Sequence, residues 1–204
     1  MLGGPGPYAG PPAGGDTIHL CAVDEAGNCV SLIQSIYHDF GSAVVGGDTG
    51  IILQNRGSYF SLDPNHVNRL EPGKRTFHTL MPSILMRNGQ PAVVFGAMGG
   101  EGQPQTQAAM VTRMVDFGYD VQQAIEAPRW VQGRTWGKQP VNLKLESRFP
   151  QQTVDELRRR GHDVEVMGDW EDTMGHAQAI RISAENGVRG GGADPRGDGM
   201  AIGC

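Results

Sequence analysis

Thr17 stands where two different kinds of sequence meet. Glycine, proline and alanine make up almost all of residues 1–15, whereas β-branched and apolar side chains typical of a strand follow at 17–24. If the chain were cut between Asp16 and Thr17, Thr17 would carry both a hydroxyl group and a free α-amine. An α-amine has an ordinary pKa of about 8, so near neutral pH it can take the proton from the hydroxyl beside it. The position makes Thr17 a candidate nucleophile, although an ordinary strand threonine also fits it.

A second hydroxyl group is expected to lie close to Thr17. Residues 25–28 read as a turn and residues 29–36 as a second strand, so the two strands form a hairpin. In this hairpin Ser35 lies near the start of the first strand. Ser35 is therefore a candidate partner of the nucleophile, and a strand serine that faces solvent is the alternative.

A pair of glycines forms the third candidate feature. The sequence predicts a strand hairpin at 83–86 and 91–96, followed by a helix at 104–117. Gly99 and Gly100 lie between that hairpin and that helix, where backbone N–H groups can point into a cleft and stabilise negative charge. No Lys-Ser/Thr pair follows, so this is not a nucleotide-binding P-loop. A tight turn without catalytic function would require the same glycines.

The order of these segments resembles the small subunit of the gamma-glutamyltransferase and cephalosporin acylase family. These are N-terminal-nucleophile hydrolases, which mature by cutting their own chain before the nucleophile. The similarity runs from about Gly15 to the C-terminus. It is carried by the blocks 17–32, 40–55, 72–82, 97–103, 120–129 and 188–196. The resemblance implies that Thr17 is the nucleophile, that Ser35 contacts its amine, and that Gly99 and Gly100 form the oxyanion hole.

Substrate-binding positions of the family carry unusual residues in this chain. Tyr37 replaces an asparagine, and Tyr59 replaces the acidic residue that holds a glutamyl α-ammonium group. His78 and Thr79 stand where two serines bind the α-carboxylate, and Arg56 adds a positive charge. Because arginine can grip a carboxylate through two hydrogen bonds, these departures favour an acyl group with a carboxylate and no α-amine. The alternatives are a surface ion pair for Arg56 and a loop position without a function for His78.

Composition excludes several classes of protein. The chain has 204 residues, a net charge of −5 and no basic run, which disfavours nucleic-acid binding. No apolar window is long enough for a membrane helix. The three cysteines do not form a disulfide framework, no His/Cys cluster has the spacing of a metal site, and no cofactor is expected. No secretory signal is visible, but in this family it would sit on the large subunit, so a cytoplasmic or a periplasmic location stays open.

The rest of the pattern predicts the fold. Residues 1–16 are expected to be a disordered leader or precursor remnant, and residues 17–204 a single small-subunit domain. Periodicity alone indicates an α+β protein. Helices are further expected at 121–127 and 150–160, and strands at 51–55 (buried), 141–145, 163–166 and 177–182. The resemblance implies an αββα sandwich, in which two stacked antiparallel sheets are flanked by helices.

Three functions follow from this sequence. The first is acyl transfer or hydrolysis of gamma-glutamyl or related amides through an acyl-enzyme, as in glutathione metabolism, after self-cleavage before Thr17. The second is a cephalosporin or glutaryl acylase of the same family. The third is a non-catalytic small-subunit fragment. Each one implies a partner, the large subunit of the same precursor, which in the family supplies an arginine for the substrate carboxylate.

Overall fold

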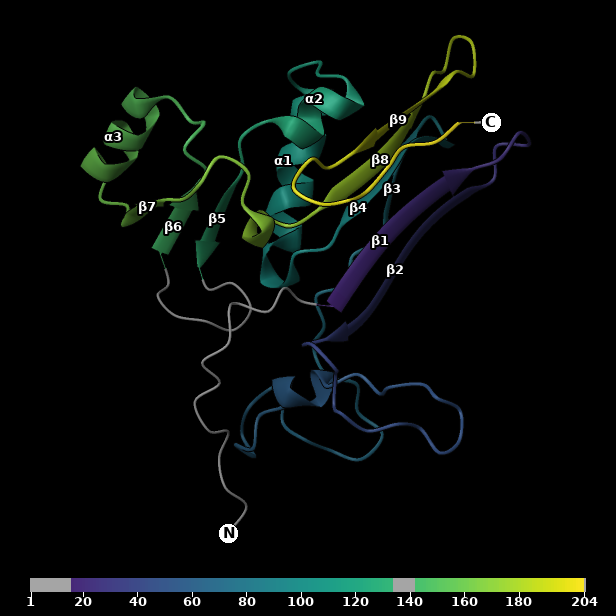
Figure 1. Ribbon diagram of the computed structural model, residues 1–204, viewed down its shortest axis with the longest axis vertical. Helices are drawn as coiled ribbons and strands as arrows, with labels where there is room; N and C mark the ends of the chain where they lie inside the picture. Colours follow the sequence, from purple (N-terminus) through teal and green to yellow (C-terminus); the bar gives the residue numbers. More distant parts are fainter. Residues whose placement is uncertain (1–15, 134–141, 204) are drawn as a thin grey trace.

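The computed structural model describes residues 16–133 and 142–203 (Figure 1). Three predicted parts of the chain therefore lie outside the described residues: residues 1–15 of the predicted leader, the first residue of the strand predicted at 141–145, and Cys204. The N-terminal hairpin consists of β1 (Asp16–Val23) and β2 (Cys29–Tyr37), as predicted. Thr17 and His19 are buried on one face of this hairpin, while Ile18 and Leu20 are exposed on the other, as the two-residue period of a strand requires.

A four-stranded antiparallel sheet lies at the centre of the molecule. Its order is β3-β4-β8-β9. The strands are β3 (Ser83–Arg87), β4 (Gln90–Ala97), β8 (Ala177–Ile182) and β9 (Arg189–Ala193). The predictions for β3, β4 and β8 are confirmed. The sequence did not predict β9, because its three consecutive glycines hide the pattern of a strand; at Gly192 a Cβ atom would lie 2.8 Å from a methyl group of Val121.

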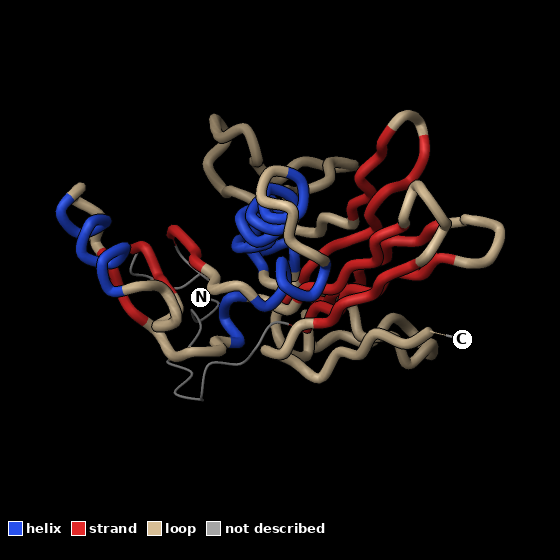
Figure 2. Tube along the Cα trace, turned by 90° about the horizontal axis from the view of Figure 1, so that it is seen from above, coloured by secondary structure: helices blue, strands red, loops and turns tan. Residues whose placement is uncertain are grey.

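Helices and the hairpin cover opposite faces of this sheet (Figures 1 and 2). The helices α1 (Gln103–Val115) and α2 (Val121–Glu126) confirm two predicted helices. Val93 and Phe95 point from β4 into the core beneath them, with Met110 and Ile125. The next residue, Gly96, faces the opposite side of the sheet, toward β1, because a Cβ atom there would lie 2.4 Å from the imidazole Nε2 of His19. The close approach of the two sheets therefore requires glycine at position 96.

A third sheet has its own small core. It contains β5 (Trp130–Gly133), β6 (Asn142–Leu145) and β7 (Val164–Val166), and the β6–β7 pair is parallel. Leu143 and Leu145 pack against Val154 of α3 (Gln151–Arg159), a helix that the sequence predicted. The α+β class is confirmed, and this sheet with its parallel pair is an addition to the predicted two.

The prediction of a buried strand at 51–55 is wrong. Ile51 and Leu53 are 64% and 46% exposed, and within the described residues the segment makes one ladder contact, an isolated bridge between Val45 and Ile52. The segment belongs to a long excursion, residues 38–82, which carries the 3₁₀ turn η1 (Arg56–Tyr59). The apolar run had the composition of a strand, but the described part of the chain offers it no neighbouring strand to complete a ladder.

Candidate active site

The hairpin is irregular at the bond that precedes Thr17. Thr17 pairs with Ser35, but Asp16 pairs with Tyr37, so the register shifts between Asp16 and Thr17 and β2 contains one extra residue, Ile36. Tyr37 has a φ of 78°, which a residue with a bulky side chain rarely adopts. A bulge and a left-handed backbone together place local strain beside the Asp16–Thr17 peptide bond.

Thr17 and Ser35 form the centre of a buried polar cluster. The side chain of Thr17 is 6% exposed, and its Oγ1 lies 2.7 Å from the Oγ of Ser35. The backbone N–H of Tyr37 donates to the same Ser35 Oγ at 3.0 Å. The structure therefore brings together the two hydroxyl groups that the sequence suggested as partners.

Arg56 joins this cluster from η1. Its guanidinium donates from Nη2 to Ser35 Oγ at 2.8 Å and from Nη1 to Thr79 Oγ1 at 3.0 Å. Its centre lies 5.0 Å from the centre of the Tyr37 ring, a distance at which a cation is attracted to the ring face. Only 5% of Arg56 is exposed, and burial lowers the pKa of its guanidinium. Because the Arg56 side chain is buried, the alternative that it forms a surface ion pair is wrong.

Aromatic rings line one side of the cluster. The ring centres of Tyr37 and Tyr59 are 4.8 Å apart, and Phe77 packs edge-on against Tyr59. Burial raises the pKa of Tyr59, and a hydrogen bond with Tyr37 adds to this effect. The Tyr59 hydroxyl donates to Glu101 Oε1 at 3.4 Å. A carboxylate thus reaches the Tyr59 position from a distant segment, which the sequence analysis missed although Glu101 directly follows the predicted glycine pair.

The contact between Tyr59 and Glu101 places the glycine pair at the same end of the molecule as the cluster around Thr17 and Ser35. Gly99 and Gly100 are buried and have φ values of 146° and 51°, and Gly100 begins the 3₁₀ turn η2 (Gly100–Gly102). Within residues 16–133 and 142–203, no backbone oxygen accepts from the N–H groups of this pair. Two buried donors at a strand-to-helix turn have the form that oxyanion stabilisation requires.

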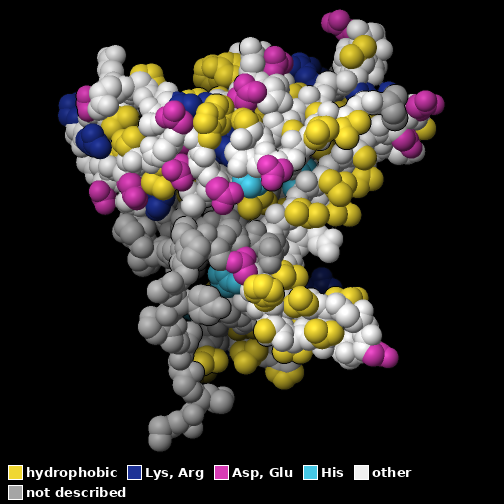
Figure 3. Space-filling view, viewed as in Figure 1, with side chains coloured by type: hydrophobic (Ala, Val, Ile, Leu, Met, Phe, Trp, Pro, Cys, Tyr) yellow, Lys and Arg dark blue, Asp and Glu magenta, His cyan; other side chains and the backbone are white. Residues whose placement is uncertain are grey.

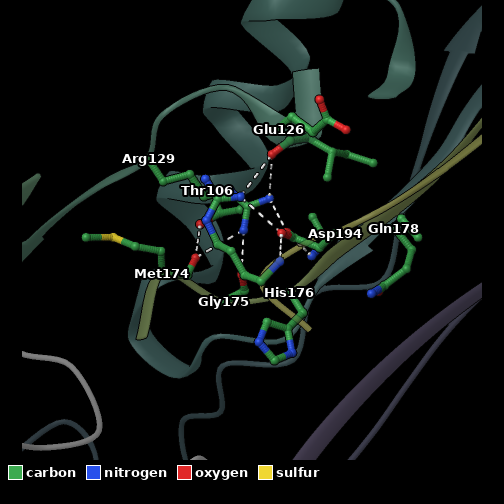
Figure 4. A network of polar contacts seen from close by, with 12 residues as sticks. Thr106, Glu126, Arg129, Met174, Gly175, His176, Gln178 and Asp194 are labelled. Carbon is green, nitrogen blue, oxygen red and sulfur yellow. Dashed lines mark hydrogen bonds and ion pairs between the residues drawn. The ribbon is translucent and has the colours of Figure 1, made fainter. Parts of the chain in front are cut away.

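A network of buried charges holds Gly175, the residue that packs against this turn (Figure 4). Arg129 donates to the carbonyl oxygen of Gly175 at 2.5 Å and forms an ion pair with Asp194. Gly175 in turn packs so closely against the turn that a Cβ atom on Gly99 would lie 3.3 Å from its Cα. Burial lowers the pKa of Arg129 to about 10, and Asp194 opposes that effect. Arg129 and Asp194 belong to the sequence blocks 120–129 and 188–196, which the fold joins here.

Two of the remaining predicted features lie outside this contact network. His78 is exposed, and its Nδ1 accepts from the backbone N–H of Leu80 at 3.2 Å. Cys21 and Cys29 are half-buried free thiols, and burial raises the pKa of Cys21 to about 11. Among the described residues there is no His/Cys/Asp/Glu group that could hold a metal ion, and no helix combines the length and the apolar character needed to cross a bilayer.

The comparison with known sequences identifies the family. A sequence model of the gamma-glutamyltranspeptidase family matches residues 5–204, so the chain belongs to that family. It is 58% identical over 192 residues to the glutathione hydrolase-like YwrD proenzyme of Bacillus subtilis (strain 168), covering 94% of this chain and 36% of that protein. It is 51% identical over 197 residues to the oxamate amidohydrolase proenzyme of Klebsiella pneumoniae subsp. pneumoniae, covering 97% of this chain and 37% of that protein.

Solved structures agree with this assignment. The cephalosporin acylase from Bacillus halodurans superposes with a TM-score of 0.81 at 44% identity, covering 89% of this chain and 33% of that one. A chain of the gamma-glutamyltranspeptidase from Pseudomonas nitroreducens, in complex with L-DON, superposes with a TM-score of 0.76 at 28% identity, covering 91% of this chain and 98% of that one. The predicted family and its N-terminal-nucleophile hydrolase fold are therefore confirmed, and the named members of the family are hydrolases, acylases and transpeptidases. The chain spans about a third of the length of the curated relatives above, both named as proenzymes.

Proposed function

We propose that Thr17 becomes an N-terminal nucleophile that hydrolyses amides, or transfers their acyl groups, through an acyl-enzyme. One observation carries this proposal. The Thr17 hydroxyl lies 2.7 Å from that of Ser35, directly after a peptide bond at which the strand register shifts. A reactive hydroxyl beside a strained bond is the arrangement that cleavage of the chain before Thr17 needs.

Cleavage and turnover use the same oxygen in this proposal. During maturation Thr17 Oγ1 attacks the carbonyl carbon of Asp16, the hydroxyl proton passes to the Thr17 nitrogen as the bond between that nitrogen and the carbonyl carbon breaks, and water hydrolyses the resulting ester. The freed α-amine then accepts the Thr17 hydroxyl proton as Oγ1 attacks the substrate carbonyl, and it returns that proton to the leaving nitrogen. Water or an amine finally takes the acyl group from Oγ1, which regains its proton. The N–H groups of Gly99 and Gly100 stabilise the oxyanion in this scheme.

The acyl group of the substrate is expected to contact Tyr37, Tyr59 and Thr79, with His78 at the exposed side. The relatives are named for different amides: a glutathione hydrolase-like protein, an oxamate amidohydrolase and a cephalosporin acylase. These names share hydrolysis of an amide bond rather than one acyl group. We therefore place hydrolysis before transfer in the proposed function.

We propose a large subunit, from the same precursor, as the partner of this chain. Hydrophobic side chains gather on the outer face of the β1–β2 hairpin and over the loops of residues 38–82 (Figure 3). On the hairpin these side chains are Ile18, Leu20, Val30 and Leu32, all exposed. Exposed apolar surface of this kind is typical of an interface with a partner chain. The length of the proenzyme relatives leaves room for such a subunit.

The first prediction tests maturation. In the full precursor, Thr17→Ala is expected to abolish cleavage after Asp16 and all amidase activity, because one oxygen performs both reactions. Thr17→Ser is expected to retain part of both, since a primary hydroxyl can still attack. Intact-mass measurement and N-terminal sequencing check the cleavage, and Thr112→Ala, an exposed helix threonine, serves as the matched control. Normal cleavage of Thr17→Ala would remove Thr17 from the mechanism, and a precursor that is never cleaved would favour a non-catalytic fragment.

A further inference from the structure

The direction of the hydrogen bond between Ser35 and Thr17 follows from the other contacts of Ser35. A serine hydroxyl has one hydrogen to donate and two lone pairs with which to accept. The Ser35 oxygen accepts from Arg56 Nη2 at 2.8 Å and from the Tyr37 N–H at 3.0 Å. Both lone pairs are therefore occupied by groups that can only donate. The hydrogen of Ser35 is left for the third neighbour, Thr17 Oγ1, at 2.7 Å.

We propose that Arg56 is a positioning residue, which fixes the Ser35 hydroxyl as a hydrogen-bond donor to the nucleophilic oxygen of Thr17. This inference rests on the proposed function of Thr17. It replaces the sequence-based hypothesis that Arg56 binds a substrate carboxylate. Arg56 acts through Ser35 and does not itself touch the reacting atoms.

The surroundings of Arg56 fit a fixed structural cation better than a mobile ligand for substrate. Nη1 and Nη2 are bound to Thr79 and Ser35, and the backbone N–H of Arg56 donates to the Gln54 side chain. The face of the guanidinium lies against the Tyr37 ring, and only 5% of Arg56 is exposed to solvent. A guanidinium that is held at both ends and stacked on a ring has lost the freedom to follow different substrates.

For the reaction, the proposed contacts affect the hydrogens of Ser35 and Thr17 and the charge of Arg56. Because Ser35 donates to Thr17 Oγ1, the hydrogen of Thr17 is directed away from Ser35 and is available for transfer to the α-amine. As Oγ1 loses that hydrogen and bonds to the carbonyl carbon, Ser35 keeps its own hydrogen and continues to donate. The positive charge of Arg56 polarises Ser35 and thereby strengthens this donation. During cleavage before Thr17 the same contacts act on the same oxygen.

Cleavage of the precursor separates the two functions of Arg56, because it involves no acyl substrate. In the full precursor, Arg56→Gln is expected to slow cleavage before Thr17 by on the order of 10- to 100-fold, the effect of losing one charge-assisted hydrogen bond. Arg56→Lys is expected to recover part of the rate, because an ammonium can still donate to Ser35. Cleavage at the normal rate in Arg56→Gln would overturn the proposal.

Turnover by matured protein gives a second, independent test. Glutaryl p-nitroanilide and its neutral analogue pentanoyl p-nitroanilide differ in the acyl carboxylate. The proposal predicts that Arg56→Gln lowers kcat for both substrates by a similar factor and leaves both KM values within about threefold. A rise in KM confined to the glutaryl substrate, with kcat unchanged, would assign Arg56 to the substrate carboxylate and contradict the proposal.

A double-mutant cycle keeps the proposal testable if Arg56→Gln folds poorly. Ser35→Ala removes the hydroxyl through which Arg56 is proposed to act, so adding Arg56→Lys to Ser35→Ala is expected to cause less than a twofold further loss of cleavage rate. An additional loss as large as that of Arg56→Lys alone would show that Arg56 acts independently of Ser35. Thr17→Ala distinguishes failure of the proposed function, since normal cleavage there removes the nucleophile whatever Arg56 does.

Discussion

His19 lies two residues after Thr17, on the same face of β1, and connects the two sheets. Its Nε2 is 2.9 Å from Ser31 Oγ, which donates to the Phe95 carbonyl oxygen and accepts from the Ser83 N–H. Because the Ser31 hydrogen is already used, Nε2 of His19 carries a hydrogen and donates to Ser31. The Nδ1 atom lies 3.2 Å from Oε1 of Gln178, an oxygen that accepts hydrogen bonds. The imidazole in this position aligns the hairpin on the central sheet.

This burial predicts an acid-sensitive fold. Burial lowers the pKa of His19 and outweighs the opposing hydrogen bond to Gln178, so the unfolded chain binds a proton at this site more readily than the folded one. Stability is therefore expected to fall as pH drops below about 6.5, the pKa of an unfolded histidine, with a slope of at most about 1.4 kcal/mol per pH unit. Urea unfolding between pH 5 and pH 7.5 measures this slope.

His19→Gln is expected to flatten the dependence over that range, because glutamine does not titrate. His66→Gln, at an exposed loop position, is the matched control and is expected to keep the slope of the unsubstituted protein. An equal slope in His19→Gln would show that other groups cause the acid sensitivity.

At the scale of single residues, the sequence predicted which side chains are candidates for the site better than it predicted the contacts between them. Thr17 and Ser35 could be paired because hairpin register is local, and the structure brings them together at 2.7 Å. The position of Arg56 between Ser35 and Thr79 depends on a loop that no periodic pattern describes. Glu101 was absent from the candidate list for a related reason, since its approach to Tyr59 joins segments 42 residues apart.

Among the elements, the turn from β4 into α1 determines where the candidate oxyanion donors point. Gly100 has a φ of 51°, a conformation that costs a residue with a side chain roughly 1 kcal/mol. Its neighbour Gly99 packs against Gly175, which the buried Arg129–Asp194 pair holds in place. The turn is thus fixed both by its own backbone and by an ion pair from the C-terminal part of the chain.

Gly100→Val is expected to reduce turnover by a factor on the order of 10² to 10³, as the loss of one oxyanion donor does in other enzymes. Gly118→Val introduces similar backbone strain, at a φ of 69° with no atom within 4 Å of the new Cβ, and it lies at the far end of α1. Measurements of kcat and of thermal unfolding on both variants separate catalysis from strain. Equal turnover in the two variants would mean that Gly100 has only a structural function.

Elements with a clear period were predictable, and those defined by their neighbours were not. The helices α1 and α3 follow from their apolar spacing and end within two residues of prediction. The strand β9 contains Gly190, Gly191 and Gly192, and it forms because β8 provides a partner along its length. The apolar segment at 51–55 does not form a strand, because a strand needs a neighbouring strand as well as a suitable composition.

At the scale of the whole molecule, the N-terminal hairpin, the long excursion and the β4–α1 turn come together near Thr17, where we propose that the acyl group binds. Tyr59 occupies the position where the family resemblance leads us to expect an acidic residue for an α-ammonium group. Glu101 provides a competing negative charge, because its Oε1 lies 3.4 Å from the Tyr59 hydroxyl. Substrate choice therefore depends on whether the carboxylate of Glu101 is accessible to the substrate or is occupied by Tyr59.

Glutaryl amides are expected to be hydrolysed at least as well as gamma-glutamyl amides by the mature complex with its large subunit. An α-ammonium paired with a buried carboxylate would typically give a preference of roughly 100-fold, and the hydrogen bond from Tyr59 competes for the carboxylate of Glu101. The measurement is kcat/KM for the two p-nitroanilides under identical conditions. Tyr59→Phe provides the matched variant, because it removes the hydrogen bond from Tyr59 to Glu101 without changing the ring and should shift the ratio toward gamma-glutamyl. A hundredfold gamma-glutamyl preference in the unsubstituted protein, lost in Glu101→Gln, would contradict the expectation and assign Glu101 to the ammonium group.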